Sequence, residues 1–86
     1  MRLDKFLKVS RIIKRRTVAN EAASAGRITV NGRVAKPSTD VEAGDEVAIR
    51  FGAKRMVFRI ESTNEYAKKE ESASMYTILS EDRIEL

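Results

Sequence analysis

The sequence predicts a small α+β protein in which two short helices pack on a mostly antiparallel sheet. Over the first 25 positions the apolar residues recur at helical spacing, whereas from Arg27 onward they alternate with polar residues. All four glycines fall at expected ends of helices or strands. Hydrophobic residues make up 42% of the 86 residues and charged residues 35%, a composition typical of one folded domain with a small core.

A first helix is expected over residues 2–9. Leu3, Phe6 and Leu7 have the spacing that places them on one face of a helix, where they can be buried together. Ser10 is expected either to end this helix or to cap a further short turn. The polar side of the helix is then left with basic residues.

A second helix is expected over residues 18–25, with Thr17 as its N-cap and Gly26 as its C-terminal stop. This helix is rich in small side chains, which permit a close approach to a neighbouring element. Four of them are expected in the core: Ala19, Ala22, Ala23 and Ala25.

A hairpin is expected over residues 27–36, where the period of the pattern changes to two. Asn31 and Gly32 lie at its centre. This dipeptide favours the positive φ angles that a two-residue type I′ turn requires. A loop over residues 37–40 should follow the hairpin.

The second half of the chain is expected to be rich in strands, over residues 46–51, 55–60 and 75–79. Alternation along the first of these strands places Phe51 on the buried face. The polar stretch 62–74 is expected to be either one or two turns of helix or a mobile loop. Residues 51–86 thus form a strand-rich extension of a core motif at about residues 2–50, within a single domain.

Charge is distributed unevenly along the chain. Residues 1–36 contain ten Lys or Arg side chains and two acidic ones, a formal charge of +8. Residues 37–86 contain seven basic and eleven acidic side chains, a formal charge of −4. A basic half on a small folded unit indicates a polyanionic partner, most often nucleic acid and less often an anionic membrane surface.

Three consecutive cations, Lys14, Arg15 and Arg16, lie at the expected N-terminus of the second helix. The helix dipole disfavours each exposed positive charge there by roughly 0.3–1 kcal/mol, so folding alone does not explain the arrangement. A bound phosphate would explain it, because free N–H groups of the first helical turn and the guanidinium groups would converge on the anion. Thr17, as the N-cap, would orient this corner.

Enzymatic and metal chemistry have little support in the sequence. The chain lacks both Cys and His, which removes disulfides, thiolate metal sites and the commonest general base. The four carboxylates between positions 40 and 46 flank expected turns, and turn formation explains them. We therefore expect no catalytic residue, metal or cofactor. Neither a signal peptide nor a membrane span is evident, so a cytoplasmic protein without a membrane partner is expected.

Phosphate recognition by a basic surface remains as the favoured chemistry. The candidate RNA-binding residues of the helical region are Arg2, Lys5, Lys8, Arg11, Lys14, Arg15 and Arg16. Arg27, Arg33 and Lys36 lie at or near the hairpin, and Asn20 is either a local capping partner or a polar contact to RNA. Double-helical RNA suits such a surface, because it is recognised by shape and backbone. Neutralising roughly five to seven phosphates predicts a log–log salt slope of about −4 to −6.

Several short motifs occur in a fixed order: Arg2-Leu3-Asp4-Lys5-Phe6-Leu7, Arg16-x-x-Ala19, Gly26-x-Ile28-x-Val30-Asn31-Gly32, Lys36-Pro37-Ser38 and Gly44-Asp45. This ordered set resembles the S-four (S4) RNA-binding domain family. The resemblance implies the αL arrangement, two helices packed on a small sheet, with RNA held by the helix pair. It also implies RNA-binding roles for Arg2, Lys5, Arg16 and Asn31, with Asp4 orienting the basic surface.

Within this family the chain is similar to the factors of bacterial ribosome-associated quality control and to the related small heat-shock ribosome-binding proteins. The opening over residues 2–7 and the segments 35–38 and 70–79 carry the similarity. It implies a non-enzymatic, monomeric factor that binds ribosomal RNA of the large subunit and peptidyl-tRNA, beside its partner RqcH, and assists alanine tailing. A ribosome assembly or structural protein, or an accessory factor of RNA modification, is the alternative.

Overall fold

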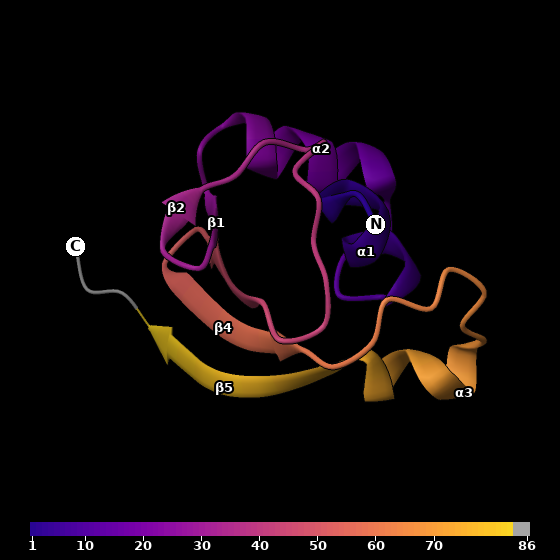
Figure 1. The fold of residues 1–86 in the computed structure, drawn as a ribbon. Helices are drawn as coiled ribbons and strands as arrows, with labels where there is room; N and C mark the ends of the chain where they lie inside the picture. The colour runs from indigo at the N-terminus through magenta and orange to yellow at the C-terminus, as the bar shows by residue number, and fades with distance from the viewer. Residues whose placement is uncertain (84–86) are drawn as a thin grey trace.

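The computed structural model describes residues 1–83. Its elements are α1 (Leu3–Val9), α2 (Arg16–Ser24), β1 (Ile28–Val30), β2 (Arg33–Val34), β3 (Glu46–Phe51), β4 (Lys54–Ile60), α3 (Lys69–Ser72), the 3₁₀ turn η1 (Ala73–Met75) and β5 (Tyr76–Arg83). The strands form one sheet in the order β2-β1-β3-β4-β5, and each neighbouring pair is antiparallel (Figure 1). The α+β prediction is confirmed.

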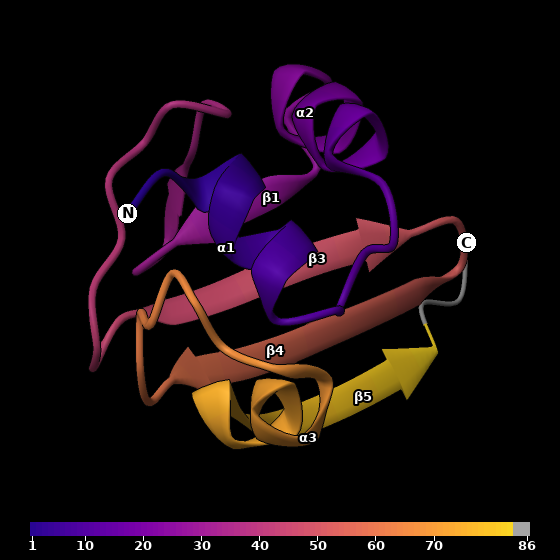
Figure 2. The same cartoon turned by 90° about the vertical axis from the view of Figure 1, so that its right-hand side faces the viewer.

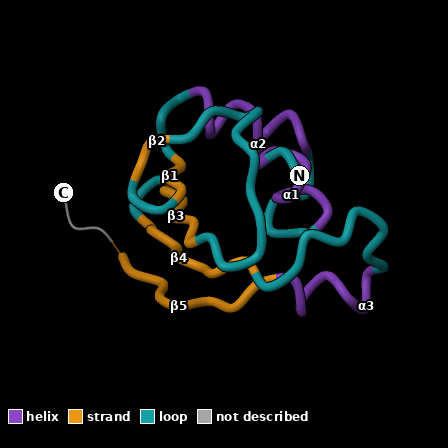
Figure 3. The backbone as a smooth tube through the Cα atoms, viewed as in Figure 1, coloured by secondary structure: helices purple, strands orange, loops and turns teal. Residues whose placement is uncertain are grey.

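The helices cover one face of the sheet. In Figure 2, α1 lies in front of the strands, with α2 on one side of it and α3 on the other. Figure 3 shows the long loop after β2 returning past α1 before β3 begins. None of the helices within residues 1–83 has the length and hydrophobicity that a membrane span requires.

The core joins α1 to the sheet. Leu3, Phe6 and Leu7 are fully buried, as their spacing predicts. The ring of Phe6 stacks on that of Phe58 in β4, with centroids 6.1 Å apart, and Phe58 meets Tyr76 of β5 edge to face at 5.7 Å. Aromatic pairs of this kind contribute about 0.5–1.5 kcal/mol each beyond the area they bury. The basic helices are therefore fixed to residues far along the chain.

The N-terminus of α1 is bound to the loop after β2. The N–H groups of Leu3 and Asp4 donate to the carbonyls of Thr39 (2.8 Å) and Pro37 (3.1 Å). The terminal amine of the chain donates to Asp40 at 2.9 Å. The first N–H groups of a helix have no partner within it, so this loop satisfies them. It thereby also fixes the start of α1, where two candidate site residues lie.

The second helix differs from the prediction at both ends. It begins at Arg16, and its N-cap is Arg15, whose carbonyl accepts the N–H groups of Val18 and Ala19. The predicted N-cap role of Thr17 is therefore wrong, since the chain becomes helical one residue before it. The helix ends at Ser24, and Ala25 at the C-cap is exposed rather than in the core.

The other alanines of α2 differ in depth. Ala19 and Ala23 are buried, whereas Ala22 is partly buried. Gly26 has a φ of +75° directly after the helix, so its predicted role as the stop is confirmed. The predicted end of the first helix is also confirmed, because Ser10 is the C-cap of α1.

The hairpin prediction is confirmed. Val30 pairs with Arg33, and Asn31 and Gly32 between them have φ angles of +52° and +83°. The prediction for Phe51 is wrong, because this residue is 40% exposed at the end of β3, where it lines a surface depression with Ile12.

The stretch 62–74 contains α3 and the start of η1, in agreement with the helical alternative. The last strand begins one residue later than predicted and continues to Arg83.

Candidate nucleic-acid interface

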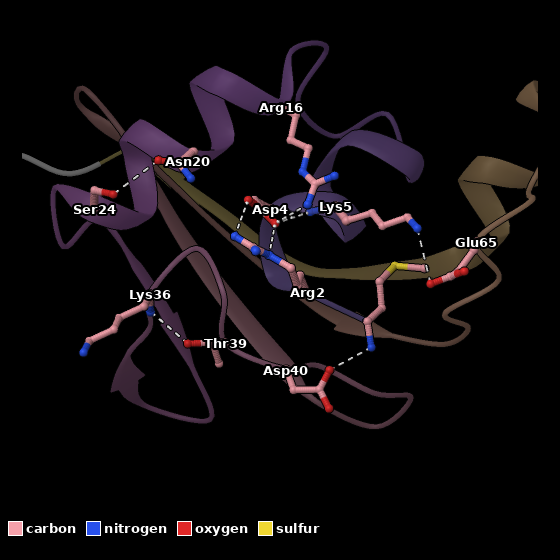
Figure 4. Close-up of polar contacts among 11 residues, drawn as sticks. Arg2, Asp4, Lys5, Arg16, Asn20, Ser24, Lys36, Thr39, Asp40 and Glu65 are labelled. Carbon is pink, nitrogen blue, oxygen red and sulfur yellow. Dashed lines mark hydrogen bonds and ion pairs between the residues drawn. The ribbon is translucent and has the colours of Figure 1, made fainter.

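A buried carboxylate lies at the centre of the basic surface. The Asp4 side chain is only 3% exposed and accepts hydrogen bonds from Arg2 Nε and Nη2 (both 3.2 Å) and from Arg16 Nη2 (3.3 Å). Its Oδ1 also accepts the N–H of Lys5 at 2.8 Å. Figure 4 shows the two arginines approaching Asp4 from different elements. We call this group of Arg2, Asp4 and Arg16 the Asp4 corner.

The Asp4 corner presents positive charge in a fixed geometry. Each guanidinium has five N–H donors, and those aimed at Asp4 use only part of that number. The side chains of Arg2 and Arg16 are 51% and 46% exposed, so their remaining donors face solvent. One carboxylate against two guanidinium groups leaves a net positive charge. This arrangement suits an anion such as a phosphate, which guanidinium groups bind through paired hydrogen bonds.

Two opposing effects set the pKa of Asp4. Burial disfavours the charged form and raises the pKa, whereas the hydrogen bonds and positive charges of Arg16 and Arg2 lower it by more in total. The net pKa lies below the ordinary value of an aspartate. Asp4 is therefore ionised at neutral pH and holds both arginines.

The N-terminus of α2 adds further cations beside this corner. Lys14, Arg15 and Arg16 are all exposed, as the charge pattern predicts, and the first turn contains no acidic residue. An open hollow beside the corner is lined by Asp4, Arg16, Thr17, Asn20 and Glu21. Asn20 Oδ1 accepts a long hydrogen bond from Ser24 Oγ at 3.5 Å, so the local partner exists while its RNA contact stays a prediction.

A second hollow lies at the other end of α1. Its lining residues are all cationic: Lys8, Arg11, Lys14 and Lys69. The first three are among the predicted RNA-binding residues, whereas Lys69, which belongs to α3 in the acidic half of the chain, is not. Nothing in the local pattern could place α3 against α1. The pair Lys68-Lys69 within the polar stretch 62–74 is the signal that the sequence contains.

Lys5 has an intramolecular partner. Its Nζ lies 3.3 Å from Glu65 Oε1, and both side chains are partly exposed (Figure 4). An exposed ion pair of this kind contributes at most about 1 kcal/mol. A phosphate would therefore compete well with Glu65 for the Lys5 ammonium. The RNA contact of Lys5 stays a prediction.

The candidates from the hairpin region are spread over several surfaces. Lys36 shares a shallow hollow with Arg2 and Asn20, so it extends the Asp4 corner. Arg27 lies apart, in a hollow with Arg50, a basic residue outside the predicted set. Arg33 is exposed on β2 at the sheet edge.

Asn31 has a role within the fold. Its Nδ2 donates to Asp45 Oδ1 and its Oδ1 accepts the N–H of Glu46, both at 3.0 Å. The side chain thus ties the β1–β2 turn to the start of β3. The RNA contact predicted for Asn31 is not needed to explain its presence there.

The described residues contain no group of three or more acidic side chains placed to hold a metal ion. A partly apolar surface depression is lined by residues of the β3–β4 hairpin, Ile12 and β5. It lies away from the Asp4 corner and shares no lining residue with it. The concentration of exposed cations on the helical side is the feature that the geometry favours as an interface.

The N-terminal half of the chain matches a known domain family. Residues 1–47 match the model of the S4 domain. An RQC P-site tRNA stabilizing factor from Listeria innocua is 63% identical over 83 residues, covering 96% of this chain and 90% of the relative. The factor of the same name from Bacillus subtilis is 56% identical over 84 residues, covering 98% of each.

Two solved structures have folds similar to that of this chain. Vibrio cholerae heat shock protein 15, described as trimeric, superposes with a TM-score of 0.83 at 31% identity, covering 93% of this chain and 82% of that one. The solution structure of the hypothetical protein HP1423 gives a TM-score of 0.78 at 26% identity, with 93% and 98% covered. The chain belongs to the S4 domain family and, within it, to the family of the RQC P-site tRNA stabilizing factors.

Proposed function

We propose that this protein binds RNA of the large ribosomal subunit and peptidyl-tRNA during ribosome-associated quality control (RQC). The Asp4 corner is the observation that carries the proposal, because it presents two half-exposed guanidinium groups on a fixed carboxylate. The names of the relatives from Listeria innocua and Bacillus subtilis supply the setting, a P-site tRNA that is stabilised. The protein acts by binding and needs no chemical step of its own.

Stabilisation of one tRNA position follows from differential binding. A factor that contacts both ribosomal RNA and tRNA only when the tRNA occupies one position lowers the free energy of that position. A single charge-assisted hydrogen bond contributes about 1.5–3 kcal/mol, which corresponds to a population shift of roughly tenfold or more. A few contacts from the Asp4 corner are therefore sufficient to favour one tRNA position.

The compartment, the oligomeric state and the protein partner are inferred from the family resemblance. The protein would work in the cytoplasm as a monomer, next to RqcH on the ribosome, while alanine residues are added to the stalled chain. In this setting the helical face contacts RNA. The opposite face of the sheet is then directed away from the phosphates (Figure 2).

Arg16→Ala tests the proposal directly. Removing one guanidinium from the Asp4 corner should weaken association with large subunits that carry peptidyl-tRNA by about 1–3 kcal/mol, or roughly 5- to 150-fold. Co-sedimentation at fixed salt measures this change. Lys54→Ala, at the distant β3–β4 turn, removes the same charge and serves as the matched control.

Unchanged co-sedimentation of the Arg16→Ala protein would remove the Asp4 corner from the mechanism. A cryo-EM reconstruction of particles isolated through the wild-type protein gives an independent result. Density on large subunits with peptidyl-tRNA is expected, with Arg2 and Arg16 against RNA. Density on every large subunit, without tRNA, would contradict the proposal and favour a structural or assembly role.

A further inference from the structure

The hollow between α1 and α3 is lined by four cations and no other residue: Lys8, Arg11, Lys14 and Lys69. They come from three segments, which are the last turn of α1, the connection to α2, and α3. All four side chains are exposed, and none forms an ion pair with another described residue. Four like charges around one depression repel one another. None of them is paired with an acidic side chain of the described residues, so an anionic ligand would relieve this repulsion.

The backbone of Arg11 gives a second, independent observation. Arg11 has a φ of +63°, in the left-handed region, directly after the C-cap Ser10. Its N–H donates to the carbonyl of Lys8 at 3.1 Å, which closes the end of α1. Glycine is the residue that fits this position without strain. The chain keeps a bulky side chain there, and strained positions of this kind cluster where the side chain has a function.

The charge and exposure of the residues that line the hollow indicate a polyanionic ligand. The four lining cations are exposed and come from three segments, so an extended polyanion can contact several of them at once. Lys and Arg side chains at this density neutralise phosphates of a nucleic-acid backbone. Lys8 also lies in the last turn of α1, where a cation is stabilised by the helix dipole and is well held for such a contact.

We propose that this hollow, the α1–α3 hollow, binds a stretch of RNA backbone distinct from the one held at the Asp4 corner. The two sites share no lining residue, and α1 lies between α2 and α3 in Figure 2. Lys69 lies outside residues 1–47, which match the S4 domain, so the C-terminal extension completes an RNA site that the S4 motif begins. The inference rests on the proposed function and extends it to a second RNA contact.

Arg11→Gly and Lys69→Ala test the inference, singly and together. Arg11→Gly removes the cation and the backbone strain at once, so its thermal midpoint should equal or exceed that of the wild type. Binding to large ribosomal subunits carrying peptidyl-tRNA is measured over a series of salt concentrations. The double variant should bind about 10- to 100-fold more weakly at physiological salt. Its log–log salt slope should be shallower by about 2, or roughly 1 for each lost phosphate contact.

Lys54→Ala and Arg16→Ala separate the possible outcomes. If Arg16→Ala weakens binding while Arg11→Gly and Lys69→Ala behave like Lys54→Ala, the α1–α3 hollow is not an RNA site and the proposed function stands. A loss of affinity with an unchanged salt slope would indicate a protein contact and would also overturn the inference. If the wild-type protein does not bind these particles, both the proposed function and the second RNA contact fail.

Discussion

A single carboxylate organises the Asp4 corner. Asp4 is almost fully buried and holds Arg2, two residues before it, and Arg16, twelve residues after it. Burial of an unpaired charge is costly, so the carboxylate is stable there only because both guanidinium groups accompany it. The same contacts restrict the two arginines to one orientation. Less conformational entropy is then lost when a phosphate binds.

Asp4→Asn should make the protein less stable at neutral pH. The amide has no charge and turns one N–H donor toward a guanidinium, so the expected loss is about 1–2 kcal/mol, reduced by the exposure of the arginines. Because the pKa of Asp4 is lowered in the folded state, its contribution is present above the unfolded pKa of about 4 and disappears as the pH falls through the folded value. Urea unfolding at pH 7 and near pH 2 measures the free energy of unfolding with Asp4 charged and with Asp4 protonated.

The stability difference between wild type and the Asp4→Asn protein should therefore shrink strongly at the acidic pH. Asp40→Asn is a suitable control, because the Asp40 side chain is 88% exposed although it pairs with the terminal amine. That variant should change stability by less than about 1 kcal/mol. An equally large difference for Asp4→Asn at both pH values would contradict the assigned role of its charge.

At the scale of elements, the sequence predicts those features whose cause is local. Asn31 and Gly32 determine their turn because the required φ angles depend on these two residues alone. Thr17 is a residue type that favours the N-cap, yet α2 begins at Arg16, and Arg16 in its first turn contacts Asp4 of α1. A helix boundary thus depends on tertiary contacts that no local pattern contains.

The candidate site likewise combines features that have a local cause with features that depend on tertiary contacts. The exposed cations before α2 could be predicted from charge alone. The orienting role of Asp4 came from family resemblance, and the pairing with Arg16 across twelve residues depends on how α1 packs on α2. Lys69 was missed because the position of α3 is set by burial of Met75 and Ser72, which polar spacing in residues 62–74 does not reveal.

The β1–β2 turn offers a test at the scale of an element. Asn31→Gly keeps the left-handed backbone but removes the hydrogen bonds to Asp45 and to Glu46 at the start of β3, and it should cost about 1–2 kcal/mol of stability. Asn31→Ala loses the same bonds and in addition places a Cβ in the left-handed region, for a further cost of about 1 kcal/mol. Thermal or urea unfolding of the two variants measures the difference.

The order of the two Asn31 variants is the informative result. Alanine should be worse than glycine. Equal stability of both variants with the wild type would show that the side chain does not hold the turn to β3, and would restore RNA contact as the reason for Asn31. Binding to ribosomal particles should change little in either variant if its role is confined to the fold.

At the scale of the whole molecule, the N-terminal motif depends on the rest of the chain. Phe58, Ile60 and Met75 are fully or almost fully buried in the same core as α1. The segment 1–50 contains none of them, so its helices would lose the surface against which Phe6 stacks. We therefore expect the candidate RNA-binding residues at the start of the chain to keep their geometry only while β4 and β5 are in place.

Two experiments test this dependence. A fragment of residues 1–50 should lack a cooperative thermal transition and dispersed amide resonances, because a chain of that size with an incomplete core has too little buried surface.

In the full-length chain, Phe58→Ala should cost about 3–5 kcal/mol by leaving a cavity in the core. Phe51→Ala is the matched control, because its ring is 40% exposed, and it should cost about 1 kcal/mol or less. A 1–50 fragment that unfolds cooperatively and binds large subunits with wild-type affinity would contradict this dependence, and would reduce the role of β4 and β5 to that of an added surface.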